Sequence, residues 1–303
     1  MKFKSAEKII APNDKQTKRL FSYSENDYKF LLNGGTMDVT ESKTAPVDSP
    51  LKLKLSTSPN PTEEMFKALD EFDRAVLSAC ISEWLAGNKV TTPAVIFRAV
   101  CGKSTAYLQS PTEKQVNEIL KSVNKMAVAL ISSDMSKVCE KFGYNGGKPL
   151  KIDFTPILPC RLEDGIFNHN PTRLIKLTAE SPILRIAKAK GQLVTFDKAL
   201  LNGGKIHNTR LAIAAKFYCL LRVLESIAHC SNLKPLITFA DIYEKCRISD
   251  SSGFTKMKCR DSVLATFDRL VAAEILKSYE KILCGNENIA VKFVFKYRRK
   301  QKN

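Results

Sequence analysis

Histidine is scarce in this sequence of 303 residues, and cysteine is never closely paired. The three histidines, His169, His207 and His229, stand far apart, and no His-x-His pair occurs. Proteins that nick DNA with a tyrosine and a metal need such paired histidines, so that chemistry is excluded here. The nine cysteines form no CxxC pair, and an odd number of scattered cysteines is typical of free thiols in a reducing compartment.

Other catalytic signatures are missing as well. The stretch Gly102-Lys103-Ser104 lacks the first glycine that a phosphate-binding Walker loop requires. His169 and Arg173 do not have the spacing of a tyrosine recombinase, and Tyr297 lies in a basic tail. No feature points to a Ser or Cys nucleophile with its partners. We therefore expect a protein that is not an enzyme and that has no cofactor, no metal and no catalytic residue.

Long apolar runs are also missing. No stretch approaches the roughly 20 apolar residues that cross a bilayer. The first residues, MKFKSAEKIIAPNDK, lack the apolar centre of a secretory signal. We expect a cytoplasmic protein that makes no membrane contact.

Positive charge is abundant and is unevenly placed along the chain. The formal net charge is +17. Basic residues exceed acidic ones by 3 in residues 1–60, by 1 in residues 61–160 and by 13 in residues 161–303. An excess of this size favours binding to a phosphate backbone, although solubility alone is an alternative reason for it.

The stretch TTPAVIFRAVCG, residues 91–102, predicts a short helix with clear ends. Thr92 is a suitable N-cap, Pro93 suits the first helical position, and Gly102 allows a left-handed stop. Because a helix this short is marginal in water, it must pack on neighbouring elements.

Those neighbours are two longer helices and a hairpin. Apolar residues three and four apart predict helices over residues 65–87 and 112–130. Residues 131–140 and 150–158 then resemble the two strands of a hairpin around a glycine-rich turn.

The same order occurs again in the second half of the chain. Helices are predicted over residues 208–228, 238–248 and 254–275, with N-caps at Asn208 and Thr238 and with Met257, Val263 and Phe267 on the apolar stripe of the last helix. A second hairpin follows, with strands over 276–283 and 289–295. Any three-helix unit could give this pattern once, but a second occurrence argues against chance.

Three helices followed by a hairpin is the order of a winged helix, whose third helix can enter a major groove of DNA. The predicted fold class is therefore α+β, mostly helical, with two tandem winged-helix domains, each a helix-turn-helix plus a β-hairpin. The predicted segments are an N-terminal extension and linker (1–61), a first domain (62–160), a structured connector (161–207) and a second domain with a basic tail (208–303). The first, nearly neutral domain suits dimerisation or a secondary DNA contact.

Candidate DNA contacts lie on the third helix of each domain and in the tail. In the second domain they are Thr255, Lys256, Lys258, Arg260, Ser262, Thr266 and Arg269, followed by Lys296, Arg298, Arg299 and Lys300. In the first domain they are Lys114, Gln115, Asn117 and Lys121. Arginine can grip guanine with two hydrogen bonds, while lysine and hydroxyl groups hold phosphates. A solvated helix face and a disordered basic end are the alternative interpretations.

The order of these stretches resembles plasmid replication initiators of the tandem winged-helix, iteron-binding class. The resemblance rests on LDEFDRAVLSACISEWLAGN, TTPAVIFRAVCG and SPTEKQVNEILKSVNKM, and then on NTRLAIAAKFYCLLRVLESI, TFADIYEKCRI and KMKCRDSVLATFDRLVAAEIL. It implies that the C-terminal copy makes the main major-groove contact and that the N-terminal copy mediates dimerisation. The long segment 1–60 departs from that pattern.

The first hypothesis is therefore a sequence-specific double-stranded DNA-binding protein that initiates replication of a plasmid or mobile element by binding repeated origin sites. Its partners would be origin DNA, a second copy of the chain and host replication proteins. A winged-helix repressor that binds an operator and a winged-helix protein-interaction adaptor are the two alternatives.

Overall fold

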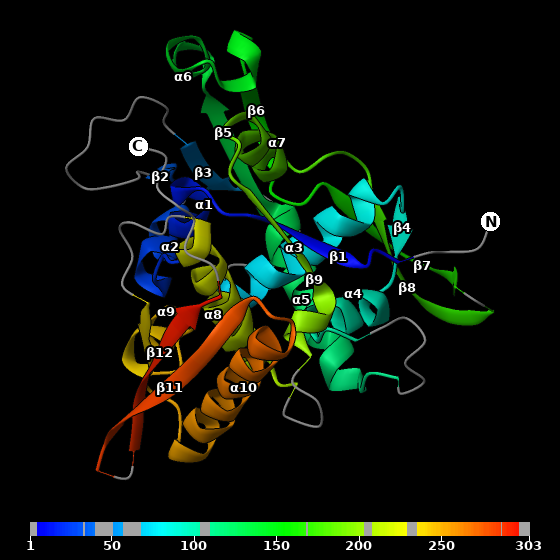
Figure 1. The fold of residues 1–303 in the computed structure, drawn as a ribbon. Helices are drawn as coiled ribbons and strands as arrows, with labels where there is room; N and C mark the ends of the chain where they lie inside the picture. The colour runs from blue at the N-terminus through cyan, green and yellow to red at the C-terminus, as the bar shows by residue number, and fades with distance from the viewer. Residues whose placement is uncertain are drawn as a thin grey trace.

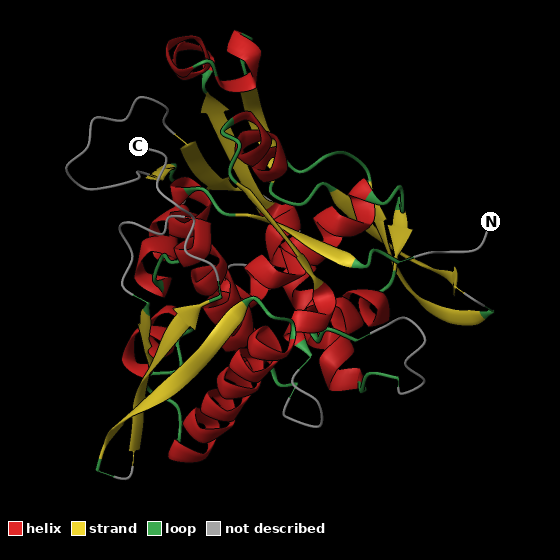
Figure 2. Cartoon of the chain, viewed as in Figure 1, coloured by secondary structure: helices red, strands yellow, loops and turns green. Residues whose placement is uncertain are grey.

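The computed structural model describes residues 5–32, 34–39, 51–56, 68–103, 110–167, 169–202, 208–228, 235–285 and 287–296. The protein mixes helices with small antiparallel sheets, as Figures 1 and 2 show. The helices gather in the middle of the molecule, and hairpins project from it.

The first helical unit contains α3 (Glu71–Leu85), the short strand β4 (Val90–Thr91), α4 (Pro93–Val100) and α5 (Glu113–Val128). Asp70 caps α3 in a capping box with Asp73, and Thr92 accepts a hydrogen bond from the Val95 amide at the start of α4. Gly102 takes a φ of 69°, so the predicted short helix and its left-handed stop are confirmed.

The second helical unit repeats this order with α8 (Arg210–Ala228), β10 (Leu236–Thr238), α9 (Phe239–Lys245) and α10 (Gly253–Ala272). Thr238 caps α9 as predicted, by accepting from the Asp241 amide. The predicted cap of α8 at Asn208 is wrong, because Thr209 accepts from the Ala212 amide. Asn208 lies one residue earlier, and its side chain instead accepts from the buried Lys216.

The hairpin of the second unit is confirmed. Strands β11 (Leu276–Cys284) and β12 (Glu287–Phe295) pair antiparallel, and β10 adds to β12, so the sheet order is β10-β12-β11. The short strand that precedes α9 is thereby joined to the hairpin that follows α10.

The predicted hairpin of the first unit is wrong in part. Strand β5 (Ala129–Asp134) does pair with β6 (Lys151–Pro156), but α6 (Ser136–Phe142) and the short η2 (Tyr144–Gly147) lie between them. Met135, Val138 and Cys139 are buried on one side of α6 and its N-cap, and Gly143 ends the helix at a φ of 67°. That helical spacing of buried residues, rather than alternation, excludes a strand through residue 140.

A different hairpin occupies the equivalent place in the first unit. Strands β7 (Cys160–Phe167) and β8 (Asn170–Leu177) pair antiparallel, and β4 adds to β8 to give the order β4-β8-β7. This is the same arrangement as β10-β12-β11 in the second unit. The residues of β8 belong to the segment that was predicted as the connector.

The rest of the predicted connector is ordered as expected. It contains α7 (Pro182–Ala189) and β9 (Leu193–Asp197), which η3 (Lys198–Leu201) follows. Strand β9 pairs with β1 (Lys8–Pro12) from the N-terminal segment.

The described part of residues 1–61 is built into the fold, so its prediction as an extension and linker is wrong there. Strands β2 (Met37–Val39) and β3 (Leu51–Leu55) extend the β5-β6 pair into the order β2-β3-β5-β6. Helix α1 (Lys15–Leu20) and helix α2 (Glu25–Leu32) lie beside the second unit in Figure 1. The stretch 20–32 docks through Tyr28 and Leu31, which are buried.

The two units share one core. Helix α3 packs against α8, and α8 packs against α10. Cys80, Cys219 and Cys246 are buried in this core as free thiols.

Candidate nucleic-acid interface

Helix α10 is the longest helix near the surface, and one face of it is fixed by the core. Cys259, Val263 and Phe267 are buried, while Ser252 caps the first turn by accepting from the Thr255 amide. In Figure 1 the start of α10 and the tip of the β11-β12 hairpin project together from the same end of the molecule. The first turns of α10 are therefore presented to solvent.

Two of the predicted basic contacts lie between α10 and its neighbours. The Arg260 guanidinium donates to Glu287 Oε1 at 3.0 Å and lies 5.8 Å from the centre of the Phe239 ring. Lys256 Nζ lies 5.9 Å from the centre of the Tyr243 ring. Arg260 thus holds the hairpin against α10, with weak cation–π attraction in addition.

Two predicted contacts on α10 are wrong. Ser262 and Thr266 are buried, and their hydroxyls donate to the carbonyls of Lys258 and Ser262 within the helix. Both lie on the face that carries Cys259, three and seven residues after it, and that face packs on the core.

The remaining candidates of the second unit lie away from the start of α10. Arg269, near the end of the helix, is exposed and donates from Nε to the Asn202 carbonyl at 3.0 Å. Lys296 Nζ pairs with Glu274 at 2.7 Å. The predicted contacts Arg298, Arg299 and Lys300 fall outside the described residues.

On α5, Lys114 and Asn117 are exposed and Lys121 is half-buried; all three line one open groove along the helix. Gln115 completes a capping box, because its side chain accepts from the Thr112 amide at 2.9 Å. The side-chain carbonyl of Gln115 is therefore already hydrogen-bonded at the start of the helix.

The structure brings candidates of both units together. One cleft of about 410 Å³ is lined by Lys114 and Gln115 from the start of α5 and by Thr255 and Lys258 from the start of α10. We call it the two-helix groove. Thr209 and Arg210, at the start of α8, lie between them. Helix N-termini carry partial positive charge, so this groove combines such charge with two lysines and with the ion pair of Arg210 and Glu118.

A buried ionic cluster holds the two units in place beneath this groove. Arg210 of α8 pairs with Asp70, lies 3.7 Å from Asp73 and pairs with Glu118 of α5 at 3.3 Å. Lys125 of α5 pairs with Asp73. Burial disfavours the ionised form of Asp70, but Arg210 and Lys125 outweigh it and hold its pKa at about 2. Burial, reinforced by Asp70, raises the pKa of Asp73.

Sequence reasoning missed two exposed apolar side chains at the start of α10. Phe254 is 61% exposed and Met257 is 44% exposed, although Met257 was predicted in the core. Phe254 lies beside Lys258, whose Nζ is 4.0 Å from the centre of its ring. Single exposed apolar side chains are common on protein surfaces, so Phe254 and Met257 are of interest only because they lie together at the start of α10, next to Lys258.

Within the described residues, no helix is long and apolar enough to cross a membrane. The same residues contain no group of three or more His, Cys, Asp or Glu side chains that could hold a metal ion.

Comparison with known proteins gives little. No protein-family model matches the chain, and no curated protein matches it. A crystal structure of domain 2 and domain 3 of RctB is similar over 87% of this chain and 91% of that chain, with 12% sequence identity and a TM-score of 0.39. At that score the similarity does not establish a shared fold.

Proposed function

We propose that the protein binds double-stranded DNA in a sequence-specific manner and initiates replication of a plasmid or mobile element from repeated origin sites. In this proposal each helical unit is a winged helix, with α5 and α10 as recognition helices and with β7-β8 and β11-β12 as wings. The first unit then extends to Leu177 instead of ending at residue 160.

The observation that carries the proposal is the two-helix groove. It places the starts of the third helices of both units side by side, with Lys114 on one and Lys258 on the other. Recognition helices in helix-turn-helix proteins contact base edges with their N-terminal residues. The two units would therefore contact one continuous stretch of duplex.

Of the excess of 13 positive charges in residues 161–303, 9 lie in residues 208–303, and this supports a leading role for the second unit in DNA contact. The nearly neutral first unit would then serve in a homodimer and in secondary contacts. Bound at repeated sites, the protein would bend or open an adjacent AT-rich segment and recruit host replication proteins. The proposed role is binding, without catalysis and without a cofactor.

Replacing the two groove lysines, Lys114→Ala with Lys258→Ala, is expected to weaken duplex binding about tenfold or more at moderate salt. If each lysine neutralises one phosphate, the slope of log affinity against log salt becomes shallower by about 2. Fluorescence anisotropy at several salt concentrations measures both quantities.

The matched control removes two exposed lysines at the opposite end of the molecule, Lys137→Ala with Lys148→Ala. It removes the same charge and should change affinity far less. Equal losses in the two double variants would mean that only the overall charge acts, and the groove would then have no special part.

Phe254→Ser is expected to weaken binding to a preferred duplex several-fold while changing the free energy of unfolding by no more than about 0.5 kcal/mol, because the ring is exposed. An apolar side chain in this position can contact a thymine methyl group. Phe142→Ser on α6, 53% exposed in the native chain, is the control and should leave DNA binding unchanged. An unchanged affinity for Phe254→Ser would remove this ring from the proposed interface.

An initiator can be distinguished from a repressor by whether the DNA beside the binding sites becomes unpaired. Permanganate footprinting on supercoiled origin DNA detects unpaired thymines. Protein-dependent reactivity beside the repeats supports initiation, whereas binding with no opened segment supports an autoregulatory repressor.

A further inference from the structure

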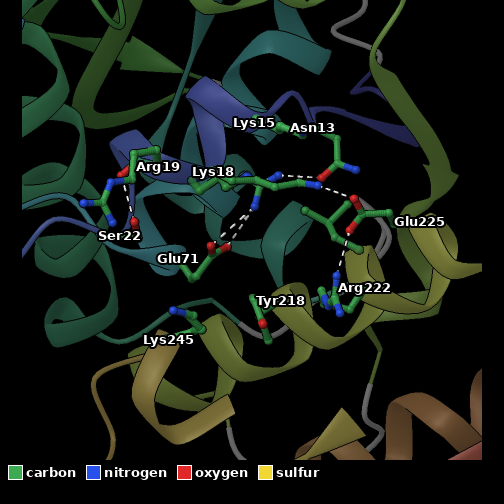
Figure 3. Close-up of a pocket in the computed structure, with 12 residues that line it drawn as sticks. Asn13, Lys15, Lys18, Arg19, Ser22, Glu71, Tyr218, Arg222, Glu225 and Lys245 are labelled. Atoms are coloured by element: carbon green, nitrogen blue, oxygen red, sulfur yellow. Dashed lines mark hydrogen bonds and ion pairs between the residues drawn. The ribbon is translucent and has the colours of Figure 1, made fainter. Parts of the chain in front are cut away.

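A second cleft, of about 290 Å³, lies where α1, α3, α8 and α9 meet (Figure 3). We call it the junction pocket. Its basic lining residues are Lys15, Lys18, Arg19, Arg74, Arg222 and Lys245, and its acidic ones are Glu71 and Glu225. None of these side chains belongs to the proposed DNA interface. The pocket therefore gathers six basic groups around two carboxylates.

The deepest of these groups is Arg74 on α3, which is only 2% exposed. One terminal nitrogen of its guanidinium donates to the Pro12 carbonyl at 3.0 Å and to Asn13 Oδ1 at 2.7 Å. The other approaches Glu71 at 3.3 Å. Its Nε has no hydrogen-bond partner among the described residues. A guanidinium fixed in this way keeps its positive charge at the base of the pocket, where it attracts an anion.

The basic side chains in the walls of the pocket also outnumber the acidic side chains that could neutralise them. Lys18 and Arg222 both pair with the single carboxylate of Glu225, as Figure 3 shows. Arg222 Nε, like that of Arg74, is buried and finds no partner within the described part of the chain. Burial lowers the pKa of Lys18; Glu225 opposes this, while Arg74 and Arg222 add to it. An anion between these groups would stabilise the charged ammonium.

The other ionic junction between the units is nearly balanced by comparison. The pocket beside Arg210 is lined by Lys121, Lys125, Arg210 and Arg247 together with Glu25, Asp70 and Glu118. When Glu244, which pairs with Lys245 at 3.2 Å, is counted as well, the junction pocket keeps an excess of three positive charges, which the pocket beside Arg210 does not share. Bringing like charges together in a partly buried site is unfavourable unless a counter-charge enters.

We propose that the junction pocket binds a small oligophosphate, free or as part of a nucleotide. Several clustered negative oxygens match six basic groups around one cleft, and Arg and Lys are the side chains that bind phosphate. Tyr218 and Leu221 provide a less polar wall beside them. A duplex could touch exposed Lys15, Arg19 and Lys245 at the rim, whereas a small ligand could also enter the cleft between the half-buried Lys18 and Arg222.

Such a ligand would connect α1 of the N-terminal segment to α3 of the first unit and to α8 and α9 of the second. Because it binds only the folded chain, it should raise the melting temperature by several degrees at high saturation.

The proposal is tested by isothermal titration calorimetry of the full chain at about 150 mM salt, close to physiological ionic strength. The titrants are sodium triphosphate, a nucleoside triphosphate and a short DNA duplex. We expect saturable 1:1 binding of a phosphate ligand, weakened about tenfold by Lys18→Met or by Arg222→Gln. The Lys137→Ala, Lys148→Ala control should bind normally. If the two wall variants do not fold, the exposed pair Lys15→Ala with Lys245→Ala replaces them.

Tighter binding of the nucleotide than of triphosphate identifies a nucleotide site, and equal binding identifies an oligophosphate site. Absence of saturable binding of either ligand overturns the proposal. The proposal is also overturned if the control pair weakens phosphate binding as much as the wall variants do. It is overturned as well if a duplex displaces triphosphate and the wall variants weaken binding of that duplex, since the pocket would then contact DNA. The proposal does not depend on sequence-specific DNA binding, so the two can fail separately.

Discussion

Replacing Gly102 with alanine is expected to destabilise the protein by at least about 3 kcal/mol. Gly102 has a φ of 69°, where a side chain is strained. An added Cβ would also lie 2.3 Å from the Asn202 nitrogen and 2.5 Å from the Lys198 carbonyl oxygen. Both are backbone atoms of η3 and its end, so neither can move aside cheaply. The added methyl group would separate the end of α4 from the segment that leads into the second unit.

Gly87→Ala is the matched control for this prediction. Its φ of 88° carries the same kind of strain, but nothing lies within 4 Å of the added Cβ. We expect it to cost only about 1–2 kcal/mol, the strain alone. Urea unfolding of both variants, followed by circular dichroism, measures the difference. If the two substitutions cost the same, the close packing of Gly102 against η3 is contradicted.

Replacing Arg210 with methionine is expected to cost about 3 kcal/mol or more at pH 7. The substitution leaves Asp70 and Asp73 buried with Lys125 as their remaining basic partner. Arg173→Met is the control, because Arg173 and Asp164 form an exposed pair on the β7-β8 hairpin, where a salt bridge contributes at most about 1 kcal/mol.

The loss in Arg210→Met should shrink as the pH falls. Burial opposes ionisation of Asp70, but Arg210 and Lys125 lower its pKa from 3.8 to about 2 in the folded protein. A lowered carboxyl pKa contributes stability that is present above the unfolded pKa and is lost as the pH falls through the folded value. Without Arg210 both carboxyl groups protonate at higher pH, which relieves their buried charge. Unfolding free energies should therefore converge between wild type and variant from pH 7 towards pH 3. A constant difference would mean that Arg210 acts by packing alone.

The helices were predictable because their signals are local. Thr92 and Pro93 start α4 and Gly102 stops it within ten residues, and Thr238 starts α9 in the same manner. Strand partners were not predictable, because they depend on residues far apart in the chain. Leu51 pairs with Ser133 and Lys8 pairs with Asp197. The first unit's hairpin was misplaced for this reason, since only the pairing of β4 with β8 identifies it.

The exposure of the start of α10 was predicted, but the rotation of the helix was not. Lys114 and Lys258 line one groove, which was not predicted from the sequence. However, the apolar pattern allowed Met257 as a core residue in place of Cys259. With Cys259 in the core, the helix turns so that Ser262 and Thr266 are buried and Phe254 and Met257 face solvent. A cysteine carries too weak a hydrophobic signal to settle that choice from sequence.

The central claim, sequence-specific duplex binding through both third helices, is tested most directly by enriching bound duplexes from a random DNA pool. The full chain and the Lys114→Ala, Lys258→Ala variant are run side by side at moderate salt. We predict one enriched motif for the wild type and a loss of that enrichment in the variant. An unchanged pool, or a motif that the variant enriches equally well, would contradict the claim.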